Sequence, residues 1–259
     1  CIAYPWIPLH HQEQLFGTTF STRRQQEKYI RTWIKNNSEC EFKGQIVFYP
    51  ADYEPKIGSI VQDSDVDITT LIPNRYHGIA ILEEPEHLNW LHRGRSWDSV
   101  FKCVVGVVHT NYVEYSKDKY GWLSSQATKL AGALLCTAYT DVNIHLSMST
   151  VKTGIPGIVC NVHGVRPHFF VDDHQAAPAH TLGKVYFLGK AMWTKGYANI
   201  FDAYSRLSGH LPPITTFGSG PDLDEIIRCA QKHHRITHRQ QTEHTPLHFS
   251  EYSVFFNPS

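Results

Sequence analysis

Apolar residues recur along the first half of the chain in short continuous runs. The runs at Gly78–Leu82 and Phe101–Val108 predict strands covered on both faces, because a strand with one exposed face alternates apolar and polar residues. Residues 45–49 predict a shorter strand that ends at Pro50, since proline lacks the N–H that continues a ladder. Residues 51–75 are polar and acidic, which indicates a surface excursion.

Helical spacing appears in two segments of the same half. Ser21–Asn36 has an apolar stripe, and Thr22 and Gln25 have the spacing of a capping box. A longer pattern predicts one helix over residues 116–140. Two further apolar runs predict strands, at residues 142–146 and 158–162.

The pattern changes after residue 165. Arg166–Gly183 contains two Pro and an Ala-rich stretch, which is typical of a linker. Strands and helices then alternate, which predicts a doubly wound parallel α/β sheet. The predicted strands are residues 184–188, 214–217 and 254–257, and the helices are residues 195–207 and 221–232. We therefore expect a first domain over 1–165, a linker over 166–183 and a second domain over 184–259.

Composition narrows the classes of function. The 24 basic and 24 acidic residues cancel, which excludes nucleic-acid binding through bulk charge. Hydrophobic residues make up 41%, enough to form a core. No stretch approaches the roughly 18 apolar residues of a spanning helix, so we expect any membrane contact to be peripheral. Because the chain opens on Cys1 and stops soon after a strand-like run, we expect an internal fragment of a longer protein.

Two strand-to-helix turns of the second domain are candidates for binding a nucleotide. In parallel sheets ligands bind beyond the carboxyl ends of strands. The first turn runs from Gly189 to Gly196 and carries Lys190 and Lys195, which would place two positive charges at a helix N-terminus. It is not a Walker A loop, and a glycine turn with solvated lysines is the alternative.

The second turn contains Gly218 and Gly220 at GxG spacing. Alone this signal is weak, and a tight turn is the favoured explanation. Two such turns in successive βα units together favour a nucleotide.

Titratable residues end two strands of the first domain. His109 follows the Val-rich strand and could act in acid–base or charge-stabilising roles, or could be held by local hydrogen bonds. The turn Glu83, Glu84, Pro85, Glu86 and His87 could supply paired carboxylates, or could be a solvated start of a helix.

A histidine-rich stretch near the end of the chain raises the question of zinc. The i, i+4 pair His234 and His238 has ligand spacing on a helix, but no Cys or carboxylate completes a regular site. A basic, exposed loop is the favoured interpretation for the whole stretch, which comprises His233, His234, His238, His244 and His248.

Several segments of the chain, taken together, closely resemble the plant-type digalactosyldiacylglycerol synthases. The most specific are Ile79–Trp90 and Val105–Tyr112, while Val159–Val165 and Tyr186–Tyr197 fit the same order. The Gly-Lys…Lys-Gly and GxG turns are shared more widely among retaining GT-B glycosyltransferases. The resemblance spans nearly the whole chain and implies a GT-B fold with two Rossmann-like domains.

The resemblance also implies a reaction and roles for residues. Such an enzyme moves galactose from UDP-galactose to the 6-hydroxyl of monogalactosyldiacylglycerol, with retention. Lys190 and Lys195 would neutralise the diphosphate leaving group, so that no metal or other cofactor is expected. His109 matches the histidine near the transferred sugar, and Gly218 and Gly220 would let the chain approach the nucleotide. Glu83, Glu84, Glu86 and His87 would face the acceptor.

The sequence also departs from the family pattern. Pro221 stands where a Glu is usual, and the acidic ExxxxxxxE element is expected after Ser259. Both Rossmann-like sheets are therefore expected to be incomplete, and the chain alone to have little transferase activity. The alternatives are another retaining GT-B enzyme with a soluble sugar acceptor, or a non-catalytic UDP-sugar-binding remnant.

A lipid acceptor would require contact with a membrane surface. The resemblance implies a peripheral protein of the chloroplast outer envelope. Residues of the types that favour the headgroup region are Trp90, Trp97, Trp122, Arg93 and Arg95, although ordinary loop packing explains them as well.

Overall fold

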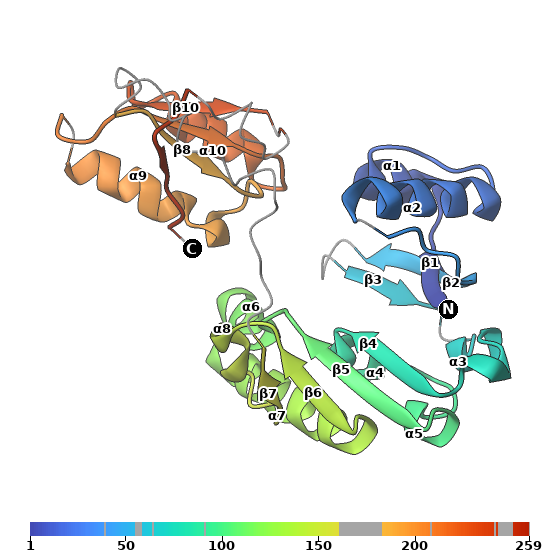
Figure 1. The fold of residues 1–259 in the computed structure, drawn as a ribbon. Helices are drawn as coiled ribbons and strands as arrows, with labels where there is room; N and C mark the ends of the chain where they lie inside the picture. The colour runs from blue at the N-terminus through green and yellow to red at the C-terminus, as the bar shows by residue number, and fades with distance from the viewer. Residues whose placement is uncertain are drawn as a thin grey trace. The chain divides into compact units, whose positions relative to one another are not determined.

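The structure is a computed structural model with two compact units, Cys1–His163 and Gly164–Ser259 (Figure 1). It describes residues 1–38, 40–54, 59–63, 65–90, 92–160, 183–207, 209–240, 242 and 251–258. The predicted linker lies outside the described residues except for Gly183. In the part of the chain that is described, no helix is long and apolar enough to cross a membrane.

The first unit opens with a three-stranded sheet. β1 (Ile2–Trp6) pairs in parallel with the first half of β2 (Ile46–Glu54), and the second half of β2 pairs antiparallel with β3 (Ser59–Gln62). The predicted strand end at Pro50 is therefore wrong. The Gln45 carbonyl accepts from β1, so alternate residues of β2 face β1 and the Pro50 nitrogen faces away from it, where no ladder bond to β1 is lost.

Two helices follow β1 in sequence, α1 (Leu9–Phe16) and α2 (Arg23–Asn37). The predicted capping box of α2 is confirmed, because Thr22 accepts from the Gln25 N–H and the Gln25 side chain bonds back. The predicted apolar stripe is only partly buried: Ile30 is 8% exposed and Trp33 is 55% exposed.

The segment expected to be a surface excursion instead forms regular structure over much of its length, and a few of its residues are buried. It contains half of β2, the strand β3, α3 (Ile68–Leu71) and the short 3-10 helix η1 (Asn74–Tyr76). Ile68 is 2% exposed and packs in one cluster with residues of β4 and β5.

A second, four-stranded parallel sheet forms the rest of the first unit, in the order β4-β5-β6-β7. Its strands are β4 (Ile79–Glu83), β5 (Cys103–Val108), β6 (Val142–His145) and β7 (Ile158–Val159). The helices between them are α4 (Pro85–Trp90), α5 (Trp97–Val100), α6 (Tyr112–Tyr120), α7 (Trp122–Tyr139) and α8 (Met148–Val151). The single helix expected over 116–140 is two helices, because Gly121 at φ 86° interrupts it.

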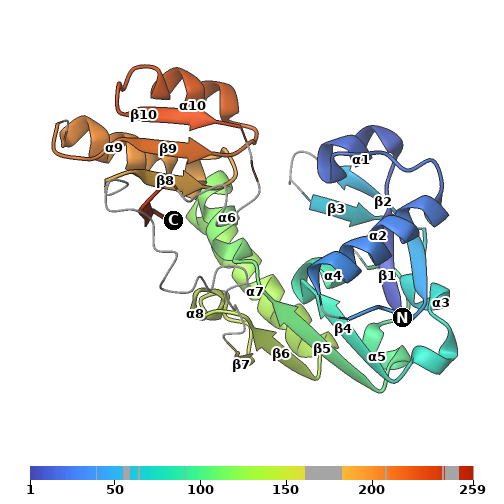
Figure 2. The ribbon, with the colours of Figure 1, turned by 45° about the horizontal axis from the view of Figure 1, so that its top comes forward.

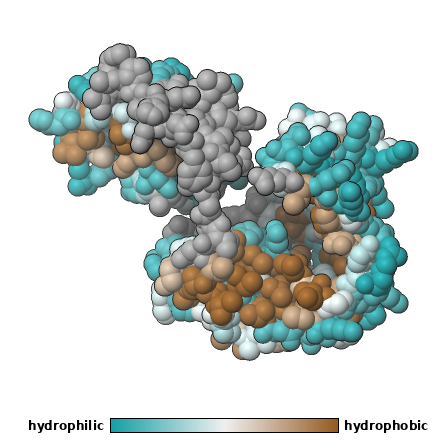
Figure 3. Space-filling model, in the orientation of Figure 1, coloured by the Kyte–Doolittle hydropathy of each residue, from teal (hydrophilic) through white to brown (hydrophobic). Residues whose placement is uncertain are grey.

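One face of this sheet is apolar and open to solvent. Ile79 and Ile81 are 64% and 66% exposed, so the expectation that β4 is covered on both faces is wrong. Ile158 and Val159 on β7 are also exposed. Figure 3 shows hydrophobic residues gathered over the four strands on the side seen in Figure 1.

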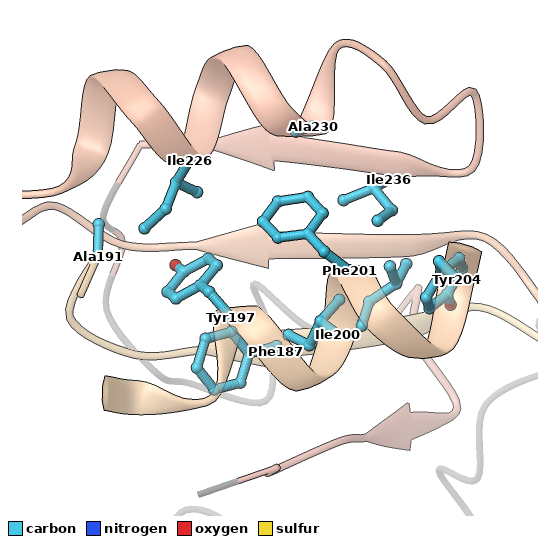
Figure 4. Packing of buried hydrophobic residues seen from close by; sticks show 10 residues of the cluster. Phe187, Ala191, Tyr197, Ile200, Phe201, Tyr204, Ile226, Ala230 and Ile236 are labelled. Atoms are coloured by element: carbon cyan, nitrogen blue, oxygen red, sulfur yellow. The ribbon is translucent and has the colours of Figure 1, made fainter. Parts of the chain in front are cut away.

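The second unit is a four-stranded parallel sheet in the order β10-β9-β8-β11. Its strands are β8 (Val185–Leu188), β9 (Ile214–Phe217), β10 (Ile236–Arg239) and β11 (Val254–Phe255). The helices are η5 (Trp193–Lys195), α9 (Tyr197–Arg206) and α10 (Leu223–Ala230). Figure 4 shows the buried core between these elements, in which Phe187, Tyr197, Ile200 and Ile226 meet.

Candidate functional site

A polar cluster forms where β4 and β5 end. The register pairs Glu83 with Val107, so the residues that follow each strand lie side by side. The Thr110 hydroxyl donates to Glu84 Oε1 at 2.8 Å, and His109 Nε2 lies 3.8 Å from the same oxygen. The structure therefore brings together two residues predicted from sequence, Glu84 and His109.

The backbone at Glu84 is held in an unusual conformation. Its φ is 63°, and it is the single non-glycine residue with positive φ among those the structure describes. A branched or long side chain in the left-handed region costs about 1 kcal/mol or more. The Glu84 N–H donates to the Val107 carbonyl at 3.1 Å, so the turn points the carboxylate toward Thr110 and His109 while staying tied to β5.

Glu86 is a buried acid beneath this cluster. The residue is 2% exposed, and Oε2 makes no hydrogen bond within the described residues. Burial raises the pKa of Glu86 to about 7, and the nearby Glu84 charge adds to the rise. A carboxyl group with this pKa can hold or release a proton near neutral pH, as acid–base catalysis requires.

The other predicted acidic-turn residues have different surroundings. His87 is buried, and its Nε2 lies 2.9 Å from the Ile60 carbonyl of β3, a contact that holds the ring in place. Glu83 is exposed. Tyr112 was missed as a site residue: burial and the Glu84 charge raise its pKa. Its position directly after the His109–Asn111 turn was the available signal.

In the second unit, backbone hydrogen bonds join the two turns that are candidates for binding a nucleotide. The Gly189 N–H donates to the Phe217 carbonyl at 3.0 Å, and the Ala191 N–H donates to the Ser219 carbonyl at 2.9 Å. The Asp222 carboxylate accepts from the Trp193 N–H at 3.0 Å. The turns after β8 and β9 therefore form one rigid surface at the carboxyl end of the sheet.

The glycines of these turns have a packing role. A Cβ on Gly218 would overlap the Gly189 carbonyl oxygen, and one on Gly220 would lie 2.5 Å from the Ala191 carbonyl oxygen. Gly196 has φ 89° and caps the start of α9, against Pro258. Close approach to a nucleotide stays a prediction for Gly218 and Gly220, since close approach of the two turns already requires glycine there.

Both predicted lysines lie on this surface. Lys190 is exposed in the turn after β8, and Lys195 is half-buried at the end of η5, directly before the first turn of α9. Among the described residues no side chain caps that turn, and the N–H groups at a helix N-terminus are donors that an anion could use. The combination of two ammonium groups and a helix N-terminus is suited to a diphosphate.

His238 lies directly beneath the GxG turn, in a position that the sequence did not predict. It is on β10 and not in an exposed loop, so the loop interpretation is wrong at this residue. Its Nδ1 is 2.9 Å from Thr216 Oγ1 and its Nε2 is 3.1 Å from the Gly218 carbonyl. Burial lowers the pKa of His238, which favours a neutral ring supporting the turn. His244 and His248 lie outside the described residues.

One group of side chains in the described ranges has the geometry to hold a metal ion. Ligand atoms of His10, His11 and Asp52 all lie within 4.8 Å of one another, and His11 Nδ1 contacts Asp52 Oδ1 at 2.8 Å. Imidazole and carboxylate together suit Zn²⁺ and similar ions. The group lies on α1 and β2, outside the predicted turns, and so does not bear on the expectation of metal-free chemistry there.

The predicted membrane-contact residues divide into two kinds. Trp97 is 4% exposed and packs in the core, and the Arg95 backbone and side chain both contact Asp67. Trp97 is therefore a structural residue, while the Arg95 side chain is 57% exposed. Trp122 is 64% exposed at the start of α7 and is open to a partner.

Curated relatives match the chain over nearly all of its length. It is 35% identical over 268 residues to digalactosyldiacylglycerol synthase 1, chloroplastic, of Lotus japonicus, covering 98% of this chain and 34% of the relative. It is 34% identical over 271 residues to digalactosyldiacylglycerol synthase 2, chloroplastic, of the same plant, covering 100% of this chain and 58% of the relative. The chain thus spans about a third to somewhat over half of their length. No protein-family model matches it.

Solved structures resemble the fold. Anabaena Alr3699/HepE in complex with UDP and glucose aligns with a TM-score of 0.57 at 9% identity, covering 99% of this chain and 73% of that one. The same protein in complex with UDP aligns with a TM-score of 0.51 at 10% identity, covering 80% and 59%. The expected GT-B class of α/β fold is confirmed.

Proposed function

We propose a function that starts from homology: the chain is a homologue, over nearly its whole length, of the digalactosyldiacylglycerol synthases. Its sequence is related to that of glycosyltransferases, and its fold is GT-B. We infer that the full-length protein transfers galactose from UDP-galactose to monogalactosyldiacylglycerol with retention, forming digalactosyldiacylglycerol. The relatives are named chloroplastic, which supports a chloroplast location, and we propose that the protein is peripheral at the plastid outer envelope.

The observation that carries the proposal is the lysine-bearing turn at the carboxyl end of β8. Lys190 lies in the turn before η5, and Lys195 is the last residue of η5, directly before the first turn of α9. As the bond to the sugar breaks, negative charge grows on the departing diphosphate, and fixed positive charges lower the energy of that transition state. This chemistry requires no metal or other cofactor at the diphosphate.

The first unit supplies the acceptor side in this proposal. His109 binds the transferred sugar, and Glu84 positions His109 and Thr110 through its carboxylate. Glu86, with its pKa near 7, is available to exchange a proton with the acceptor hydroxyl through this cluster.

A transfer assay with the full-length protein tests the function. UDP-galactose and monogalactosyldiacylglycerol in mixed vesicles are expected to yield digalactosyldiacylglycerol with an alpha linkage. His109→Ala is expected to lower kcat by about 100-fold or more, while the matched control His210→Ala, at an exposed position of the second unit, leaves it unchanged.

Two results would contradict the proposal. Galactosyl or glucosyl transfer to a soluble sugar but not to the galactolipid would favour a different retaining glycosyltransferase. UDP binding without any turnover would favour a non-catalytic nucleotide-sugar-binding protein.

A further inference from the structure

Helix α7 is apolar on the side that faces away from the protein. Its buried residues are Ser125, Gly132 and Cys136, which recur at helical spacing on one side. The opposite side is exposed and carries Leu123, Ala127, Leu130, Ala131, Leu134 and Ala138. The three leucines on it are 77%, 62% and 61% exposed. Such a stripe on a surface helix is normally turned toward a core.

The stripe continues at the tip where α6 and α7 meet. The two helices form an antiparallel hairpin, because the Ser116 hydroxyl lies 2.7 Å from that of Ser124 and 3.1 Å from that of Thr128 (Figure 2). The tip carries Tyr120 and Trp122, which are 60% and 64% exposed. Tryptophan and tyrosine are the side chains that favour the boundary between water and lipid.

The hairpin stands next to the candidate acceptor residues. α6 begins at Tyr112, directly after the His109 turn, and the buried face of α7 reaches Glu86: a Cβ on Gly132 would lie 3.9 Å from Glu86 Cβ. The thickness of one helix, about 10 Å, therefore separates the exposed leucines from Glu86.

From this juxtaposition we propose that the outer face of α7 and the tip of the hairpin dock on a lipid bilayer, with the helix lying in the interface beside the acceptor site. This rests on the proposed function, because a galactolipid acceptor has its acyl chains in a bilayer and its sugar at the surface. The helix does not span the membrane; its apolar side enters the interface while its opposite side stays packed on the protein.

The exposed face of the β4–β7 sheet is a different kind of surface. Parallel sheets carry helices on both faces in folded proteins, so a protein segment is the expected cover for Ile79 and Ile81. The outer face of α7 is a single row of apolar residues on a helix whose other side is already packed on the protein. Aromatic residues of the kind that favour the water–lipid boundary lie at the end of this row. This arrangement fits a bilayer.

Vesicle partitioning of this chain tests the proposal. The probes are vesicles of phosphatidylcholine with monogalactosyldiacylglycerol, with and without anionic phosphatidylglycerol. Leu123→Glu with Leu130→Glu is expected to lower partitioning by about tenfold or more, because two leucines no longer enter the interface. Trp122→Ala is expected to lower it less, and added salt is expected to have little effect since apolar contact dominates.

Controls separate this proposal from the proposed function. Trp33→Ala removes a tryptophan that is 55% exposed on α2 of the same unit, and should leave partitioning unchanged. UDP affinity and the melting temperature of the chain should be the same in Leu123→Glu/Leu130→Glu as in the parent, so loss of folding or of the nucleotide site is detected independently.

Two outcomes would overturn the proposal. One is unchanged partitioning of the double glutamate variant. The other is a dimer in sedimentation experiments that the same variant dissociates, which would show that a second copy covers the helix. Failure of galactosyl transfer with intact vesicle binding would count against the proposed function alone.

Discussion

The carboxyl ends of the strands carry different chemistry in the two units. At the ends of β4 and β5, titratable side chains gather: Glu84, Glu86 and His109, with a strained backbone at Glu84. At the ends of β8 and β9, backbone hydrogen bonds join the two turns into one surface, and Lys190 and Lys195 lie beside it.

This difference suggests a division of roles. A cluster with a buried acid whose pKa is near 7 is suited to managing protons and orienting a neutral hydroxyl. A rigid turn with fixed positive charges is suited to receiving an anion whose charge increases during the reaction. The same location on two parallel sheets thus supports two different steps.

The largest effect is expected from Gly218→Ala in the second unit. The added Cβ would overlap the Gly189 carbonyl, so the two turns must separate. We expect a loss of about 3 kcal/mol in the free energy of unfolding of this unit, together with loss of UDP binding. Hydrogen exchange of the second unit's amides and calorimetric UDP titration measure both.

The matched control for that substitution is Gly78→Ala. A Cβ there meets nothing within 4 Å, and stability should stay within about 0.5 kcal/mol of the parent. Equal stability of the Gly218 and Gly78 variants would contradict the close packing of the two turns.

The next effect concerns Glu86 and pH. Its pKa is raised in the folded state, so the fold favours the protonated form, and stability is highest below the unfolded pKa of 4.5 and is lost as pH rises toward about 7. We expect a decrease of about 2–3 kcal/mol across that window for the first unit. In Glu86→Gln this decrease should vanish, as measured by urea unfolding at a series of pH values. A pH profile that is the same in both proteins would show that Glu86 does not titrate in this way.

The smallest effect isolates the strain at Glu84. Glu84→Gly and Glu84→Ala remove the same carboxylate, but only glycine adopts φ 63° without cost. We expect the glycine variant to be about 1 kcal/mol more stable than the alanine variant, while both lower galactosyl transfer by the full-length protein. If the two variants are equally stable, the backbone at this turn is not strained.

The sequence predicts those helices and strands whose signal lies within the segment itself. Val185–Leu188 is an apolar run that ends before Gly189, and Ile214–Phe217 is rich in β-branched residues and lies between Pro213 and Gly218; both strands form as expected. β10 was missed because its sequence, Ile-Thr-His-Arg, is mostly polar. It forms a strand because it pairs in parallel with β9, and His238 adds contacts to Thr216 and to the Gly218 carbonyl, which are distant in sequence.

The candidate site could be predicted only in part for the same reason. Each of Glu84 and His109 could be identified as a residue at a strand end, but their pairing follows from the register of β4 and β5. The burial of Glu86 depends on α7 packing over it, and no local pattern carries that information. The turn at Glu84 and Glu86 becomes part of a titratable cluster through long-range packing, which residue type alone does not reveal.

The most direct test of the account is the affinity of this chain for UDP, measured by calorimetry. The Lys190→Ala/Lys195→Ala variant is expected to bind UDP about 100-fold more weakly than the parent, since each charge-assisted contact contributes about tenfold. Lys232→Ala, at an exposed position after α10, should bind as the parent does. Unchanged UDP affinity in the double variant would contradict the claim that these two lysines receive the diphosphate.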